Sequence, residues 1–150
     1  GTGKTTLAKK LSKYFNLSLY TTDQLVWRKW RVDKRSDEEI KKKIKEIVTG
    51  DAWILEGVHG WHWMEEAFKE AEFVIILCLP FWLTAYRIFR REFIEKRTNK
   101  FQNRLLLFKY AYIYKNGHFP RHKRFVSLFS KKHVILKSRK EVGGFLFSLQ

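Results

Sequence analysis

The sequence predicts one α/β domain built on a parallel sheet, and three observations carry this prediction. A glycine-rich turn at residues 1–4 runs directly into a stretch with apolar residues at helical spacing. Apolar runs and amphipathic stretches then alternate along the chain, the order typical of parallel strands joined by helical crossovers. Residues 73–79 are apolar throughout, as expected for a strand covered on both faces. The 150 residues form one domain with at most a small appendage.

The elements of the first half follow from local patterns. Residues 5–15 form a helix, 17–20 a short strand and 21–24 a polar turn, while 25–30 are aromatic and basic. Ser36 and Glu39 have the spacing of a capping box, which begins a helix that runs to about Thr49 and stops at Gly50.

The second half continues the alternation. Its expected elements are a strand at 52–56, a helix at 62–71, a strand at 73–79 closed by Pro80, a helix at 81–97, helices at 103–115 and 121–130, a strand at 133–136 and a weak helix at 141–150. No strand precedes the glycine turn, so we expect the chain to lack its first strand at the N-terminus.

Composition excludes several classes of protein. Hydrophobic residues make up 45% and aromatic residues 17%, too many for a disordered chain. The longest uncharged apolar stretch, 73–86, contains Pro80 and is shorter than the roughly 18 to 20 residues of a membrane helix. The single cysteine, Cys78, excludes an internal disulfide and fits a reducing compartment. With no visible signal peptide, we expect a cytoplasmic protein without a membrane span.

The charge is strongly asymmetric. The net charge is +16, but residues 1–80 carry 14 basic and 12 acidic side chains, whereas residues 81–150 carry 17 and 3. A half with this excess attracts polyanions such as nucleotides, nucleic acid or an acidic membrane face. The alternative is a solvated basic surface, and charge alone does not separate the two.

The opening residues carry the most specific motif. Gly1, Thr2, Gly3, Lys4, Thr5 and Thr6 match the second half of the phosphate-binding loop G-x-x-x-x-G-K-[ST]. Glycines let successive amides point at phosphate oxygens, Lys4 reaches the β- and γ-phosphates, and the Thr5 hydroxyl is a magnesium ligand. The alternative is an incidental turn that happens to contain a lysine.

Beyond this loop, the segments at 17–23, 53–57, 73–80 and 134–141 and the arginine-bearing helix fall in a familiar order. With them the chain resembles the small P-loop kinases of adenylate-kinase type, and most closely the bacterial proteins labelled topology modulation proteins. The resemblance implies a P-loop NTPase three-layer sandwich with strand order 2-3-1-4-5, whose first strand is missing here. It also implies a helical lid around 92–125 and binding of ATP with Mg²⁺.

The resemblance assigns roles to residues outside the loop. Asp23 would face the acceptor and orient or deprotonate its hydroxyl, with a turn-capping aspartate as the alternative. Glu56 would help hold magnesium, or cap the next turn. Arg87 and Arg91, four residues apart on one helix, would stack on adenine and grip the transferring phosphate, unless they form a solvated basic face.

Ser138 and Arg139 follow the last strand, where the relatives wrap adenine with main-chain contacts. Elsewhere, Trp27 and Trp30 with neighbouring basic residues could stack on a base, although packing is favoured. The pairs His59 and His62, and His118 and His122, are weak signals for zinc.

These residues favour a kinase that moves the γ-phosphate of ATP to a small-molecule or nucleotide acceptor, with an NTPase as a variant. The alternative is a basic nucleic-acid-binding protein or nucleic-acid-associated NTPase without kinase turnover, whose binding would weaken steeply as salt rises.

Overall fold

The structure is a computed structural model that describes residues 2–29, 32–57, 62–94, 109, 112–113, 123–124, 126–128 and 132–149, with the backbone alone at 92 and 93. The chain divides into two compact units. We call residues 3–74 and 125–132 the α1–α4 unit, and residues 1–2, 75–124 and 133–150 the α5–α8 unit. Each unit is described by itself.

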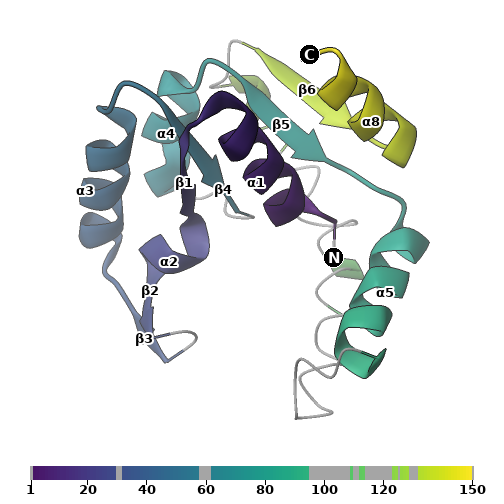
Figure 1. The fold of residues 1–150 in the computed structure, drawn as a ribbon. Coiled ribbons are helices and arrows are strands. Elements are labelled where there is room, and N and C mark those ends of the chain that lie inside the picture. The colour runs from purple at the N-terminus through teal and green to yellow at the C-terminus, as the bar shows by residue number, and fades with distance from the viewer. Residues whose placement is uncertain are drawn as a thin grey trace. The chain divides into compact units, whose positions relative to one another are not determined.

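The α1–α4 unit alternates helices and strands, as Figure 1 shows. Its elements are α1 (Lys4–Phe15), β1 (Ser18–Thr21), α2 (Thr22–Val26), β2 (Trp27–Lys29), β3 (Asp33–Lys34), α3 (Asp37–Val48), β4 (Trp53–Glu56), the 3-10 helix η1 (His62–Met64) and α4 (Glu65–Glu70). Strands β1 and β4 are parallel, and their register places Thr21 opposite Glu56. The carboxyl ends of both strands therefore lie side by side.

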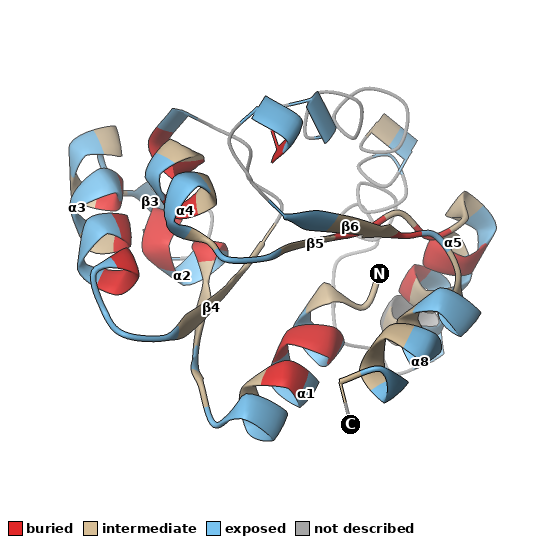
Figure 2. Cartoon of the chain, turned by 90° about the horizontal axis from the view of Figure 1, so that it is seen from above, coloured by how far each residue is buried: buried red, intermediate tan, exposed pale blue. Residues whose placement is uncertain are grey.

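The core of this unit lies between α2, α3, η1 and α4. Helix α3 buries four aliphatic side chains on one face, and two of them, Ile40 and Ile44, have no exposed surface. Figure 2 shows this buried face in red beside the buried residues of α2 and α4. The rest of the cluster is formed by Leu25, Val26, Ile47, Val48, Trp63, Met64 and Ala67. Helix α1 separately buries Leu7, Ala8 and Leu11.

The α5–α8 unit contains most of a second strand pair. Its elements are β5 (Val74–Leu77, whose first residue belongs to the other unit), α5 (Phe81–Phe89), the π-helical turn η2 (Arg90–Ile94), β6 (His133–Leu136) and α8 (Arg139–Phe147). The amide of Val74 donates to Lys132 and the amide of Cys78 donates to Leu136, at 3.0 and 2.9 Å. Both bonds advance in the same direction along the two segments, as in parallel strands.

The prediction of an α/β fold with parallel strands is therefore confirmed at this level. The capping box of Ser36 and Glu39 and the strand at 133–136 are also confirmed. The predicted helix 81–97 differs, because its α-helical part ends at Phe89 and the π-helical turn follows. Among the described residues, no helix is both long and apolar enough to cross a membrane.

Helix α2 and the antiparallel pair β2–β3 were not predicted. Two backbone bonds close this pair, from Val32 to Lys29 and from Arg35 to Val26, both at 2.9 Å. The segment between the strands has no glycine or asparagine to signal a tight turn, so a local pattern does not reveal it. The expected lid at 92–125 lies almost entirely outside the described residues.

Candidate functional site

The opening turn leads directly into α1. Gly3 has φ 91° and ψ 13°, a left-handed conformation that glycine adopts without steric cost, and it stands as the N-cap of the helix. No side chain of the described residues caps the helix at this residue, and the first turn contains no acid. The first amides of a helix lack intrahelical acceptors and carry partial positive charge. The turn therefore offers donors suited to an anion. Gly1 lies outside the described residues.

Lys4 is held among charges rather than in open solvent. Its side chain is partly buried, and this burial lowers the pKa of Lys4 below its ordinary value. The carboxylates of Glu56 and Asp23 partly offset the effect, because they favour the charged ammonium. Lys4, Asp23 and Glu56, which the sequence places far apart, are thus close enough to interact electrostatically.

Thr5 and Glu56 are in direct contact. The Thr5 hydroxyl donates to Glu56 Oε1 at 3.0 Å. Glu56 is the last residue of β4, and the parallel register with β1 brings Asp23, two residues beyond Thr21, to the same sheet edge. The Glu56 carboxylate therefore lies against the first turn of α1.

Asp23 is exposed in the first turn of α2. The cap of this helix is Thr21, whose hydroxyl accepts from the Gln24 amide at 3.4 Å. Thr21 therefore provides the N-cap of α2, and Asp23 follows in its first turn.

A close approach fixes the edge that carries both acids. A Cβ added to Gly57 would lie 1.7 Å from the hydroxyl oxygen of Thr22, so only glycine fits beside this side chain. Thr22 is 1% exposed, and its hydroxyl has no hydrogen-bond partner among the described residues. Asp23 directly follows Thr22, and Glu56 directly precedes Gly57. The packing of Gly57 against Thr22 therefore fixes the positions of the two carboxylates relative to each other.

Thr5 and Glu56 supply oxygen donors that fit Mg²⁺. A hydroxyl and a carboxylate are the hard ligands this ion takes from proteins, and it usually keeps waters and phosphate oxygens in its other positions. Within the described part of the chain, no group of three or more His, Cys, Asp or Glu gathers as a metal cluster.

The other predicted residues lie in the α5–α8 unit. Arg87 Nη1 donates to the main-chain carbonyl of Thr2 at 3.0 Å. Burial lowers the pKa of the Arg87 guanidinium, and the like charge of Arg139 lowers it further. Arg91 is partly buried in η2, whereas its competitor Arg90 is exposed. The structure thus brings Thr2, Arg87 and Arg139 near one another.

Ser138 and Arg139 line an open pocket of about 480 Å³ with Pro80, Trp82, Leu83 and Tyr86. Trp82 and Tyr86 are largely exposed aromatic side chains of α5, and the lining is mainly apolar. A planar, weakly polar group fits such a surface. The sequence did not single out Trp82 or Tyr86; their spacing of four on a helix that follows a strand was the available signal.

The Ser138 side chain has a structural role as well. Its hydroxyl accepts from the Glu141 amide at 3.1 Å and donates to Glu141 Oε1 at 3.0 Å, so it caps α8. The S-x-x-E spacing of these two residues is the sequence signal for this cap. Only its main chain remains available for the role that the resemblance assigns.

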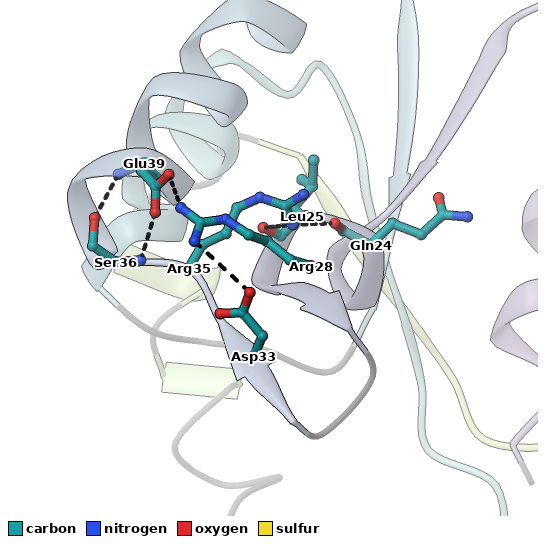
Figure 3. A network of polar contacts seen from close by, with 7 residues as sticks. All are labelled: Gln24, Leu25, Arg28, Asp33, Arg35, Ser36 and Glu39. Carbon is teal, nitrogen blue, oxygen red and sulfur yellow. Dashed lines mark hydrogen bonds and ion pairs between the residues drawn. The ribbon is translucent and has the colours of Figure 1, made fainter.

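The basic residues near Trp27 are engaged elsewhere. Figure 3 shows Arg28 paired with Glu39 and with Asp33, the latter at 3.8 Å, and Arg35 donating to the carbonyls of Gln24 and Leu25 at 2.8 and 3.1 Å. Trp27 is partly buried against the core. These contacts favour packing for Trp27 and Arg28, whereas Trp30 and Arg31 lie outside the described residues. His62 likewise contacts Asp37 at 3.2 Å on the surface.

Comparison with known proteins gives no match: no family model, no curated protein and no solved structure is similar to this chain.

Proposed function

We propose that this chain is an ATP-binding phosphotransferase that moves the γ-phosphate of ATP to a small-molecule or nucleotide acceptor. The observation that carries the proposal is the arrangement at the start of α1. A partly buried Lys4 lies close enough to Glu56 and Asp23 to interact with them electrostatically, and Thr5 donates to Glu56 at 3.0 Å. Burial disfavours the charge on Lys4, and an anion with more negative charge than the two carboxylates would stabilise that charge further. A triphosphate is such an anion.

Each residue then has a chemical role. Lys4 neutralises the transferring phosphate, and Asp23 orients an acceptor hydroxyl or takes its proton. Thr5 and Glu56 would hold Mg²⁺, which screens phosphate charge when bound. The main chain at Ser138 and Arg139, with the pocket beside Trp82 and Tyr86, would accept the base.

The finer fold assignment belongs to the same proposal. In the order 2-3-1-4-5 the second strand pairs with the third, and the fourth with the fifth. The pairs β1–β4 and β5–β6 are compatible with these two partnerships, which supports the proposal.

Ligand-dependent stabilisation tests the proposal. A ligand at about 100 times its Kd stabilises a folded protein by about 2.7 kcal/mol, which raises Tm by several degrees in a domain of this size. We expect Mg²⁺-ATP to raise the Tm of the natural chain and not that of Lys4→Met. The matched control is Lys9→Met, which replaces an exposed lysine of α1 and should keep the full shift.

The same experiment carries an internal check without nucleotide. The Tm of Lys4→Met should equal or exceed that of the natural chain, because the substitution removes a charge that burial disfavours. An unchanged nucleotide shift in Lys4→Met contradicts the proposal. An assay of ATP consumption with and without nucleosides, nucleotides and small alcohols then separates a kinase from an NTPase.

A further inference from the structure

The contact between Arg87 and Thr2 joins positions 85 residues apart in the chain, inside one unit. The donor is Nη1 of a partly buried guanidinium on α5, and the acceptor is a main-chain carbonyl of the opening turn. Because the acceptor is a main-chain atom, this contact restrains the backbone conformation of the turn and does not depend on the side chain at position 2.

We propose that Arg87 is a positioning residue that orients the phosphate-binding turn through the Thr2 carbonyl, rather than a clamp on the transferring phosphate. This inference rests on the proposed function. In this role, the hydrogen bond from Arg87 keeps the amides of the turn oriented for a phosphate when no nucleotide is bound.

Peptide geometry gives the reason. The carbonyl of Thr2 and the amide of Gly3 belong to one planar trans peptide, so they point in opposite directions. A hydrogen bond that fixes the carbonyl toward Arg87 therefore fixes the Gly3 N–H away from it. Gly3 is left-handed and Lys4 is helical, a succession that curls neighbouring amides toward a common point. Arg87 thus holds the first amide of this anion-binding curve.

The charge environment fits this role. The partly buried Arg87 lies close enough to Arg139 for the two like charges to repel each other. The Thr2 carbonyl accepts a hydrogen bond from the guanidinium, so this N–H of Arg87 has a partner although the side chain is partly withdrawn from solvent. Anchoring one N–H to the carbonyl also leaves the cation near the turn, where it adds to the positive potential that attracts phosphate.

Affinities for ligands with different numbers of phosphates distinguish positioning from clamping. The probes are Mg²⁺-ADP, a non-hydrolysable Mg²⁺-ATP analogue, and adenosine, and the variants are Arg87→Met and Arg87→Lys. A positioning residue acts on both phosphorylated ligands alike, so we expect Arg87→Met to weaken each by about tenfold, the effect of one lost charge-assisted hydrogen bond. Adenosine, which has no phosphate, should bind as before.

Two controls exclude a general loss of structure. Arg87→Lys keeps a positively charged N–H donor group and should recover part of the affinity even if its Tm equals that of Arg87→Met. Arg90→Met replaces an exposed arginine of η2 and should bind all three ligands as the natural chain does.

Each other outcome has a definite reading. Loss of affinity for the ATP analogue alone makes Arg87 a γ-phosphate clamp and overturns the inference. Unchanged affinity for both nucleotides, or an equal loss for adenosine, also overturns it. If the natural chain binds neither nucleotide, the proposed function itself is wrong, whereas binding that Lys4→Met abolishes and Arg87→Met leaves intact removes the inference alone.

Discussion

Helices α3 and α8 begin in the same way and end in different environments. Each starts at a serine whose hydroxyl accepts the amide of a glutamate three residues later, Ser36 with Glu39 and Ser138 with Glu141. Helix α3 then buries four aliphatic side chains, whereas α8 buries none and leaves Phe147 77% exposed. Figure 2 shows the contrast between the two helices directly.

The difference separates where a helix begins from what stabilises it. A cap satisfies two backbone donors and fixes the first residue of a helix, but the free energy of a packed face is several times larger. The α1–α4 unit therefore has a core that can position its acids, whereas α8 contains no fully buried side chain. Three pairs of substitutions test this contrast.

The largest effect is expected from apolar truncation. Ile44 has no exposed surface, so Ile44→Ala should lower the free energy of unfolding by about 2–5 kcal/mol. Phe147→Ala, in α8, should change it by less than about 0.5 kcal/mol, because the ring is already exposed. Urea unfolding of both variants measures this. Equal losses would mean that α8 is packed in solution, and the contrast would fail.

Replacing two glycines by alanine should change the free energy of unfolding by smaller amounts, with a loss at Gly57 and a gain at Gly143. Gly57→Ala places a methyl group against Thr22 and should cost about 1–3 kcal/mol, the usual penalty of overpacking. Gly143→Ala meets nothing within 4 Å and should stabilise α8 by about 0.5–1 kcal/mol, since alanine favours the helix.

A second substitution checks the cause at Gly57. Adding Thr22→Ala to Gly57→Ala removes the hydroxyl and methyl that the new Cβ would meet, so part of the lost stability should return. Unfolding free energies of the single and double variants give the coupling. Simple additivity of the two changes would place the strain elsewhere.

Much of the fold was accessible from the sequence because it depends on local patterns. The α3 capping box, the apolar stretch that contains β5 and the strand β6 each lie within a few residues. Helix α2 and the β2–β3 pair were missed because their bonds join segments without a turn signal. The π-helical turn after α5 was also missed, since the arginine-rich continuation has a good helical pattern.

In the candidate site too, features that follow from a local motif could be predicted, whereas contacts between distant segments could not. The residue types at the opening turn follow from one motif, and the contact between Thr5 and Glu56 was anticipated only as a shared role at the metal. The contact of Arg87 with Thr2 and the close approach of Gly57 to Thr22 depend on packing between distant segments. Side-chain pattern does not encode such contacts, so they appear only in the folded chain.

The smallest expected effect separates the two caps by their charges. Hydrogen bonds from the Ser36 amide and from Arg28 hold the pKa of Glu39 below its ordinary value of 4.5. The Lys137 amide and the Ser138 hydroxyl lower the pKa of Glu141 in the same way. Each glutamate has a lower pKa in the folded chain, so its stabilising contribution is present above pH 4.5 and is lost as pH falls through the folded value.

Glu39→Gln and Glu141→Gln should therefore each lower stability slightly at pH 7 and flatten the pH dependence below 4.5. The charge partner Arg28 makes the effect at Glu39 fall as salt rises, because exposed ion pairs are screened. The effect at Glu141, whose two bonds come from an amide and a hydroxyl, should change less with salt. Urea unfolding at pH 7 and pH 4, in low and high salt, measures both. An equal salt response would show that Arg28 adds little beyond the shared cap, leaving burial as the one difference between the helices.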